Sequence, residues 1–115
     1  MEKKTNFIYD KDYDNLIISN KQENEKVENN YIFGDFIISI AGNGKVVSLE
    51  ILQVSNYLKK VGFDPKILEN IQNIELMVEA KRDYVQIGFQ IFSLLKQKID
   101  RKLVPVANLP LVAIN

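Results

Sequence analysis

Acidic residues alternate at Asp10, Asp12 and Asp14, and this is the first pattern in the chain that could bind a metal ion. Such spacing opens a calcium-binding loop, which also needs glycine at its sixth position and glutamate at its twelfth. Counted from Asp10, those positions hold Asn15 and Lys21. The segment fits a hairpin turn better, in which the aspartates accept local backbone hydrogen bonds. We therefore predict no metal site and no cofactor.

Catalytic residues have little support in the composition. The chain contains no histidine and no cysteine, so Ser-His-Asp and Cys-His catalysis in their usual forms, thiolate zinc sites and disulfides are excluded. Glu50 is the carboxylate to test first for acid–base chemistry, because it lies between Leu49 and Ile51 in a predicted strand. A single glutamate on the outer face of a hairpin is usually solvated or paired with a lysine. We therefore predict a non-enzymatic protein.

The apolar, uncharged C-terminal segment, residues 104–115, differs from an ordinary polar chain terminus. Its large side chains must pack on this domain, pack on a partner, or stay exposed. Packing on the protein's own sheet is the simplest use, and exchange or augmentation with a second chain is the alternative. The candidate interaction residues are Leu109, Leu111, Val112 and Ile114. They favour a self-associating domain, expected to be a homodimer, or a domain that binds another protein.

Binding of RNA or a small ligand is the alternative function. Surfaces for single-stranded nucleic acid combine aromatic side chains with a basic groove. The aromatic candidates are Tyr31, Phe33, Phe36, Tyr84, Phe89 and Phe92, and the basic candidates are Lys96, Lys98, Arg101 and Lys102. Core packing is the other use of these rings. Nucleic acid is the less favoured partner, because 15 basic and 15 acidic residues balance and the pI is near 6.3.

The N-terminal half of the chain, which carries Asp10, Asp14 and Glu50, is predicted to be β-structure. Apolar patterns indicate short strands at 6–9 and 15–19, and the polar segment 20–30 is predicted to be a loop. Residues 31–41 are predicted to form one strand, followed by a second strand from 46 to about 54. Asn43-Gly44 between them is the strongest short hairpin signal, because both central residues of a type I′ turn need positive φ. A strand after the glycines also argues against a phosphate-binding loop.

Two short helices are predicted next. Ser55 can cap a helix that ends near Gly62. Asp64-Pro65 supplies an N-cap followed by proline, which opens a second helix through about Ile71.

The C-terminal part is again predicted to be strands. Alternation predicts strands over 74–80 and 85–91, joined by a turn at 81–83, and a last strand over 99–107. Pro105 has no N–H group to donate, so the last strand is expected at a sheet edge. The predicted fold is α+β and mainly antiparallel, with about seven strands and two short helices between the two β halves.

The chain has the size of one domain, with 115 residues and a mass of 13.3 kDa. We predict a β-hairpin unit at 1–53, a helical connection at 54–72 and a second β unit at 73–115. The N-terminus lacks the apolar run of a secretory signal, and no apolar stretch is long enough to span a bilayer. We therefore expect a cytoplasmic protein without membrane partners.

Residues 7–55 contain a set of recognisable motifs: Tyr9-Asp10, residues 14–18 (DNLII), and above all residues 44–52 (GKVVSLEIL) with Ser55. Together they resemble the domain-of-unknown-function 2283 family. The chain departs from the family pattern where Asn15, Ile17, Ser48 and Gln53 replace alanine, tyrosine, glycine and aspartate, respectively. The resemblance implies a small β-rich protein without an established activity, and some members lie beside toxin-like partners. An antitoxin-like or regulatory role is therefore expected from it.

Overall fold

Two antiparallel β-sheets and two short helices make up the computed structural model, which describes residues 6–95 and 98–110. The larger sheet has the order β1-β2-β5-β4-β3, and the smaller has the order β6-β7-β8. The strands are β1 (Asn6–Asp10), β2 (Asn15–Ser19), β3 (Val27–Phe33), β4 (Phe36–Ala41), β5 (Val46–Ile51), β6 (Ile71–Ala80), β7 (Tyr84–Leu95) and β8 (Lys98–Pro110). The predicted α+β, mainly antiparallel fold is confirmed, with eight strands in the described part instead of about seven.

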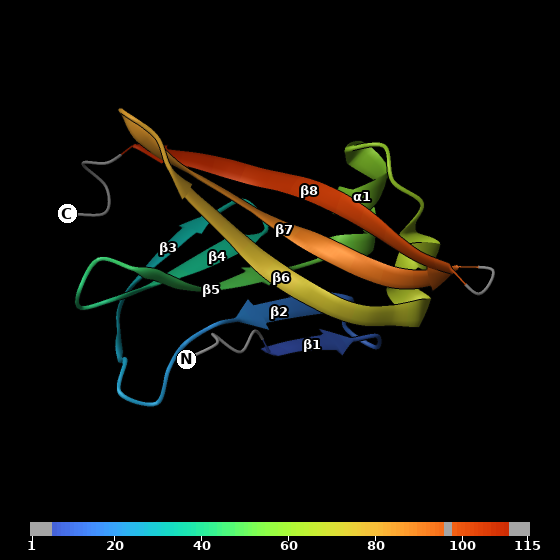
Figure 1. Cartoon of the computed structure of the whole chain (residues 1–115), viewed down its shortest axis with the longest axis horizontal. Helices are drawn as coiled ribbons and strands as arrows, with labels where there is room; N and C mark the ends of the chain where they lie inside the picture. The colour runs from blue at the N-terminus through green and yellow to red at the C-terminus, as the bar shows by residue number, and fades with distance from the viewer. Residues whose placement is uncertain (1–5, 96–97, 111–115) are drawn as a thin grey trace.

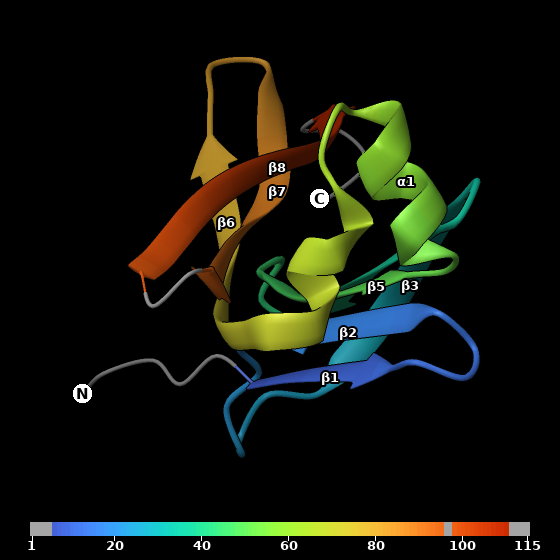
Figure 2. The same cartoon turned by 90° about the vertical axis from the view of Figure 1, so that its right-hand side faces the viewer.

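The smaller sheet and both helices cover one face of the five-stranded sheet (Figures 1 and 2). The helices are α1 (Val54–Lys60) and the 3₁₀ helix η1 (Pro65–Asn70). One cluster of buried side chains fills the space between these layers. Its members include Leu16, Ile18, Ile38, Leu49 and Ile51 from the larger sheet, Val54, Leu58, Ile67 and Leu68 from the helices, and Ile74, Ile87, Phe89, Ile91 and Val104 from the smaller sheet.

The prediction of one strand over 31–41 is wrong, because this segment contains a tight turn. Phe33 of β3 pairs with Phe36 of β4, and Gly34 and Asp35 form the turn between them. Gly34 has φ 55°, and glycine at the first turn position is typical of a type II′ hairpin. The turn pairs Ile32 with Ile37, so these two side chains share the outer face of the sheet. Ile38 therefore points to the opposite, covered face, and it is buried whereas Ile32 is exposed.

The prediction of a loop over 20–30 is wrong at its end, where β3 begins at Val27. Residues 27–30 are all exposed, because β3 is an edge strand of the larger sheet. An edge strand with polar side chains on both faces has no hydrophobic alternation to reveal it.

The predicted hairpin at Asn43-Gly44 is present, but its turn has a different form. The backbone N–H of Gly44 donates to the carbonyl of Ala41 at 2.9 Å, and the N–H of Ala41 donates to the carbonyl of Lys45 at 2.9 Å. Gly44 alone in this turn has positive φ, at 84°. This is the arrangement of a three-residue loop, in which a turn is followed by one left-handed residue.

The two predicted helices are also present, with one change of cap. Helix α1 ends in a Schellman motif, because Gly62 has φ 90° and the N–H groups of Gly62 and Phe63 donate to Lys59 and Leu58. Asp64 caps η1, as predicted, by accepting from the N–H of Lys66 at 3.0 Å. Ser55 does not cap α1, because the helix already begins at Val54.

The three strands predicted for the smaller sheet are present and each is longer than predicted, but Val78, expected on the covered face of β6, is 41% exposed. β7 is central, its side chains at Val85, Ile87, Phe89 and Ile91 are buried, and β8 is an edge strand as Pro105 predicted. The β7–β8 register shifts between Ile87 and Gly88, directly opposite Pro105. A β-bulge beside proline suits an edge strand, where a missing N–H costs no ladder hydrogen bond.

Candidate interaction surfaces

The aspartates of the β1–β2 turn serve the backbone and helix α1. Asp10 accepts from the N–H groups of Asp12 and Tyr13, at 3.1 and 3.3 Å, as expected of a hairpin turn. Asp14 accepts from the N–H of Ser55 at 3.2 Å and from its hydroxyl at 2.5 Å. The Tyr9 hydroxyl also donates to Asp14, at 3.1 Å, and burial together with this carboxylate raises the pKa of Tyr9. Asp14 therefore supplies the cap that Ser55 was expected to supply.

Glu50 lies in the middle of an apolar row on the outer face of the five-stranded sheet. Backbone pairing places Ile8, Ile17, Glu50, Ile37 and Ile32 side by side across all five strands. The two ends of the row are the most open, since Ile8 is 65% exposed and Ile32 is 73% exposed. The next row on this face is polar throughout, and consists of Asn6, Ser19, Ser48, Ser39 and Asn30.

The predicted C-terminal interaction residues are described only in part. Leu109 belongs to β8, where it pairs with Val85, so the beginning of this segment extends the smaller sheet. Leu111, Val112 and Ile114 lie outside the described residues. Their role in an interface stays a prediction.

The predicted basic residues do not share one face in the described part of the chain. Lys98 opens β8 opposite Leu95, and Lys96 lies outside the described residues. Arg101 is exposed and Lys102 is half-buried, and successive residues of a strand point to opposite faces.

The predicted aromatic residues are also divided between the two sheets. Tyr31 and Phe36 belong to the larger sheet, whereas Tyr84, Phe89 and Phe92 belong to β7. Phe89 is fully buried in the core. Binding of RNA or a small ligand stays a prediction, without a common aromatic face among these five rings.

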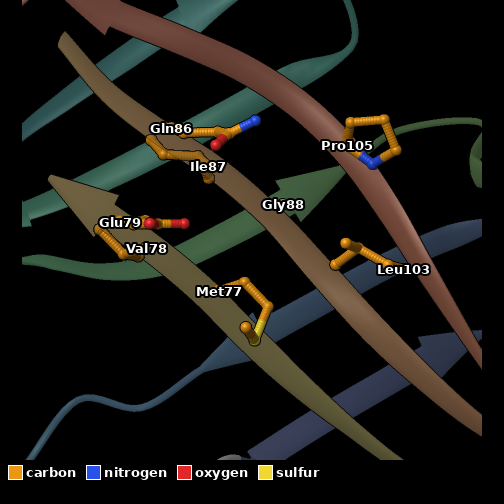
Figure 3. A pocket seen from close by; sticks show the side chains of 8 residues that line it. All are labelled: Met77, Val78, Glu79, Gln86, Ile87, Gly88, Leu103 and Pro105. Carbon is orange, nitrogen blue, oxygen red and sulfur yellow. The ribbon is translucent and has the colours of Figure 1, made fainter. Parts of the chain in front are cut away.

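A shallow apolar hollow lies on the outer face of the smaller sheet (Figure 3). Its volume is about 290 Å³, and it forms over Gly88 of β7, between Met77 of β6 and Leu103 and Pro105 of β8. Met77 is 40% exposed and Leu103 is 57% exposed. These walls give the smaller sheet an apolar surface that faces away from the core.

Gly88, which lines the hollow, lets β8 pass very close to β7. A Cβ atom at this position would lie 2.6 Å from the carbonyl oxygen of Val104 and 3.4 Å from the Cα of Pro105. Met77, Gly88 and Pro105 are direct cross-strand neighbours, so the glycine leaves a gap between two larger side chains. A lone glycine within an alternating strand is the sequence signal that could have predicted this close approach.

Charged residues of opposite sign flank the hollow on the two edge strands. Glu75 and Glu79 of β6 lie on the same face as Met77, and Arg101 of β8 lies on the same face as Leu103. Glu79 is paired with Lys81 at 2.7 Å, and this hydrogen bond raises the pKa of Lys81. The face is therefore acidic at β6 and basic at β8, with apolar side chains between.

Within residues 6–95 and 98–110, no group of three or more acidic side chains gathers in a way that could hold a metal ion. In the same part of the chain, no helix is long and apolar enough to cross a membrane. No family model, curated protein or solved structure matches the chain. The resemblance of residues 7–55 to the domain-of-unknown-function 2283 family stays a prediction, as does the regulatory role it implies.

Proposed function

We propose that this chain is a non-enzymatic protein-binding domain that self-associates through the outer face of β6, β7 and β8. The observation that supports it most directly is the apolar hollow over Gly88, bordered by the exposed side chains of Met77 and Leu103. Apolar side chains grouped on an exposed surface with a polar border are typical of protein interaction sites. A cytoplasmic location, expected from the sequence, belongs to the same proposal.

The outer face of the larger sheet suits a second copy less well. Its apolar row has Glu50 at the centre, between Ile17 and Ile37. Two copies packed symmetrically over this row bring one Glu50 near the other, and like charges in an interface are unfavourable. The smaller sheet has no carboxylate at its centre, because Gln86, Gly88 and Gln90 occupy the outer positions of β7.

The size of the face predicts a weak dimer. Three strands about 4.8 Å apart and ten residues long cover about 480 Å² per copy, or about 950 Å² for two copies. This is near the lower limit of about 1,000 Å² for a specific interface. We therefore expect a dimer that dissociates on dilution through the micromolar range.

Light scattering on a size-exclusion column, repeated over a range of concentrations, tests the proposal. The wild-type mass should rise with concentration from the monomer value of 13.3 kDa toward twice that value. Leu103→Asp places a charge at the hollow and should leave a monomer at every concentration. Ile32→Asp is the matched control, because Ile32 is equally apolar and 73% exposed but lies on the other sheet.

The result that would overturn the proposal is a wild-type chain that stays monomeric throughout. A dimer that survives Leu103→Asp, or that is lost equally in Ile32→Asp, would also overturn it. Circular dichroism of each variant establishes that it is folded, and Met77→Lys is a second variant of the same surface.

A further inference from the structure

We infer that two copies associate about a two-fold axis parallel to β7, so that β6 of each copy lies on β8 of the other. This inference rests on the proposed function and specifies its partner as a second copy of the chain in one orientation. It follows from where the charges lie on the outer face of the smaller sheet, and from the position of the hollow between its strands.

Two symmetric arrangements can pack this face against itself. An axis along the strands places β6 over β8 of the other copy, whereas an axis across the strands places β6 over β6 and β8 over β8. A two-fold interface uses the same patch on both copies, so each contact occurs twice. Each attractive or repulsive charge contact therefore contributes twice to the free energy of association in either arrangement.

Glu75 and Arg101 decide the orientation. Glu75 of β6 is level with Gln90 and Leu103, and Arg101 is one side-chain step further along β8, level with Phe92. An axis along β7 brings each Glu75 within reach of Arg101 of the other copy. An axis across the strands through the hollow brings Glu75 of each copy over Glu79 of the other, which places like charges together and is unfavourable. Glu79 contributes less, because Lys81 of the same chain already pairs with it.

The hollow fits the same orientation. Met77 is level with Gly88, and Gly88 is level with Pro105, so rotation about β7 places Met77 of one copy over β8 of the other, beside Pro105. There it can enter the hollow over Gly88 (Figure 3). Methionine is unbranched and flexible, which suits the filling of an irregular gap.

Charge reversal tests the orientation. Arg101→Glu and Glu75→Arg each convert two attractive contacts into two repulsive ones, so each variant alone should raise the dimer dissociation constant by about tenfold. An equimolar mixture of the two variants should form a heterodimer with affinity close to wild type. The double variant in one chain should recover the homodimer for the same reason.

Arg82→Glu is the matched control, because it makes the same change in net charge at the exposed β6–β7 turn. Its dissociation constant should stay within about twofold of wild type, since charges outside an interface act weakly. Sedimentation equilibrium measures all of these constants on the full chain.

Cysteine cross-linking gives a second measurement that does not depend on charge. The chain has no cysteine of its own, so a thiol-specific cross-linker reacts only at introduced positions. A short bismaleimide should join Glu75→Cys mixed with Leu103→Cys into a cross-linked heterodimer, whereas neither variant alone should cross-link. A bismaleimide is used because sheets packed face to face lie about 10 Å apart, which is too far for a disulfide.

The outcomes separate this inference from the proposed function. A wild-type dimer that Leu103→Asp abolishes, but that both charge reversals leave unchanged, overturns the inference and keeps the proposed function. A Glu75→Arg variant that alone binds more tightly than wild type indicates the axis across the strands, because the arginine then faces Glu79 of the other copy, and also overturns the inference. A monomeric wild-type chain overturns both.

Discussion

The hydroxyl of Tyr57 in α1 donates a hydrogen bond to the main-chain carbonyl oxygen of Pro105 in β8. The ring of Tyr57 also meets the ring of Phe36 edge-on, with centroids 4.8 Å apart and an angle of 89°. Phe36 begins β4 of the larger sheet, so one side chain of the helix contacts a strand from each sheet. Tyr57 therefore helps to hold β8, the edge strand of the smaller sheet, against the larger sheet.

Tyr57→Phe should lower the free energy of unfolding by about 0.5–1.5 kcal/mol, which is the usual net contribution of a hydrogen bond. The ring contact with Phe36 remains, so the loss reports the hydroxyl group alone. Urea unfolding measures the difference. Tyr13→Phe is the control, because Tyr13 is 75% exposed and should change little. Equal losses in the two variants would contradict the role of the Tyr57 bond.

The Tyr57 hydroxyl also makes the free energy of unfolding depend on pH in the alkaline range. Burial raises the pKa of Tyr57 above its ordinary value of 10.0, so the folded state holds this proton more tightly than the unfolded state. The resulting stabilisation is complete below the unfolded pKa and is lost as the pH rises through the folded pKa. Phenylalanine has no proton to lose at this position.

The difference in free energy of unfolding between wild type and Tyr57→Phe should therefore narrow as the pH rises through and above the ordinary tyrosine pKa of 10.0. Urea unfolding of both proteins at several pH values measures it, and the subtraction removes the titration of other groups that the two proteins share. A difference that stays constant, or grows, across this range would show that the folded and unfolded pKa values do not differ in the expected direction.

Asp14→Ala should destabilise the chain by about 1–2 kcal/mol, because the N-terminus of α1 loses the acceptor for the Ser55 N–H group. Asp14 also has φ 57°, a left-handed conformation that asparagine tolerates better than alanine. Asp14→Asn should therefore lose less stability than Asp14→Ala. Thermal unfolding compares both with Asp12→Ala, an exposed neighbour in the same turn. A loss in Asp12→Ala as large as in Asp14→Ala would count against the cap.

Gly88→Ala should cost about 1–3 kcal/mol, since the new methyl group meets the backbone of β8 at Val104 and the strand must move. Gly42→Ala is the matched control, because there the methyl group meets only the end of the Glu28 side chain, which can rotate away. Urea unfolding should therefore give a clearly smaller loss for Gly42→Ala. The close approach of β7 and β8 would be in doubt if the two losses were equal.

The alternation of apolar and polar residues predicted much of the smaller sheet correctly. Ile74, Ile87, Phe89 and Ile91 are buried as expected, because a strand with one covered face must place every second side chain in the core. Pro105 correctly predicted an edge strand, because the missing N–H is a local property of the residue. These features depend on neighbours along the chain.

The errors fall where the environment of a residue is set by distant parts of the chain. β3 begins earlier than predicted, because polar residues of an edge strand carry no alternation. The sequence predicts Ser55 as the cap of α1, but the capping acceptor is Asp14, 41 residues away. The interaction residues predicted at the C-terminus did not include the hollow over Gly88, because this hollow forms only where β8 lies against β7.

By itself, the sequence determined the α+β class, most of the strands, both helices and the hairpin at Gly44, since φ preferences and side-chain alternation act over a few residues. Only the tertiary structure decided that β2 pairs with β5, that four isoleucines align around Glu50, and that acidic and basic edge strands flank one apolar face. Strand order and register arise from contacts between residues far apart in the chain. Local patterns do not encode which distant strand becomes the neighbour.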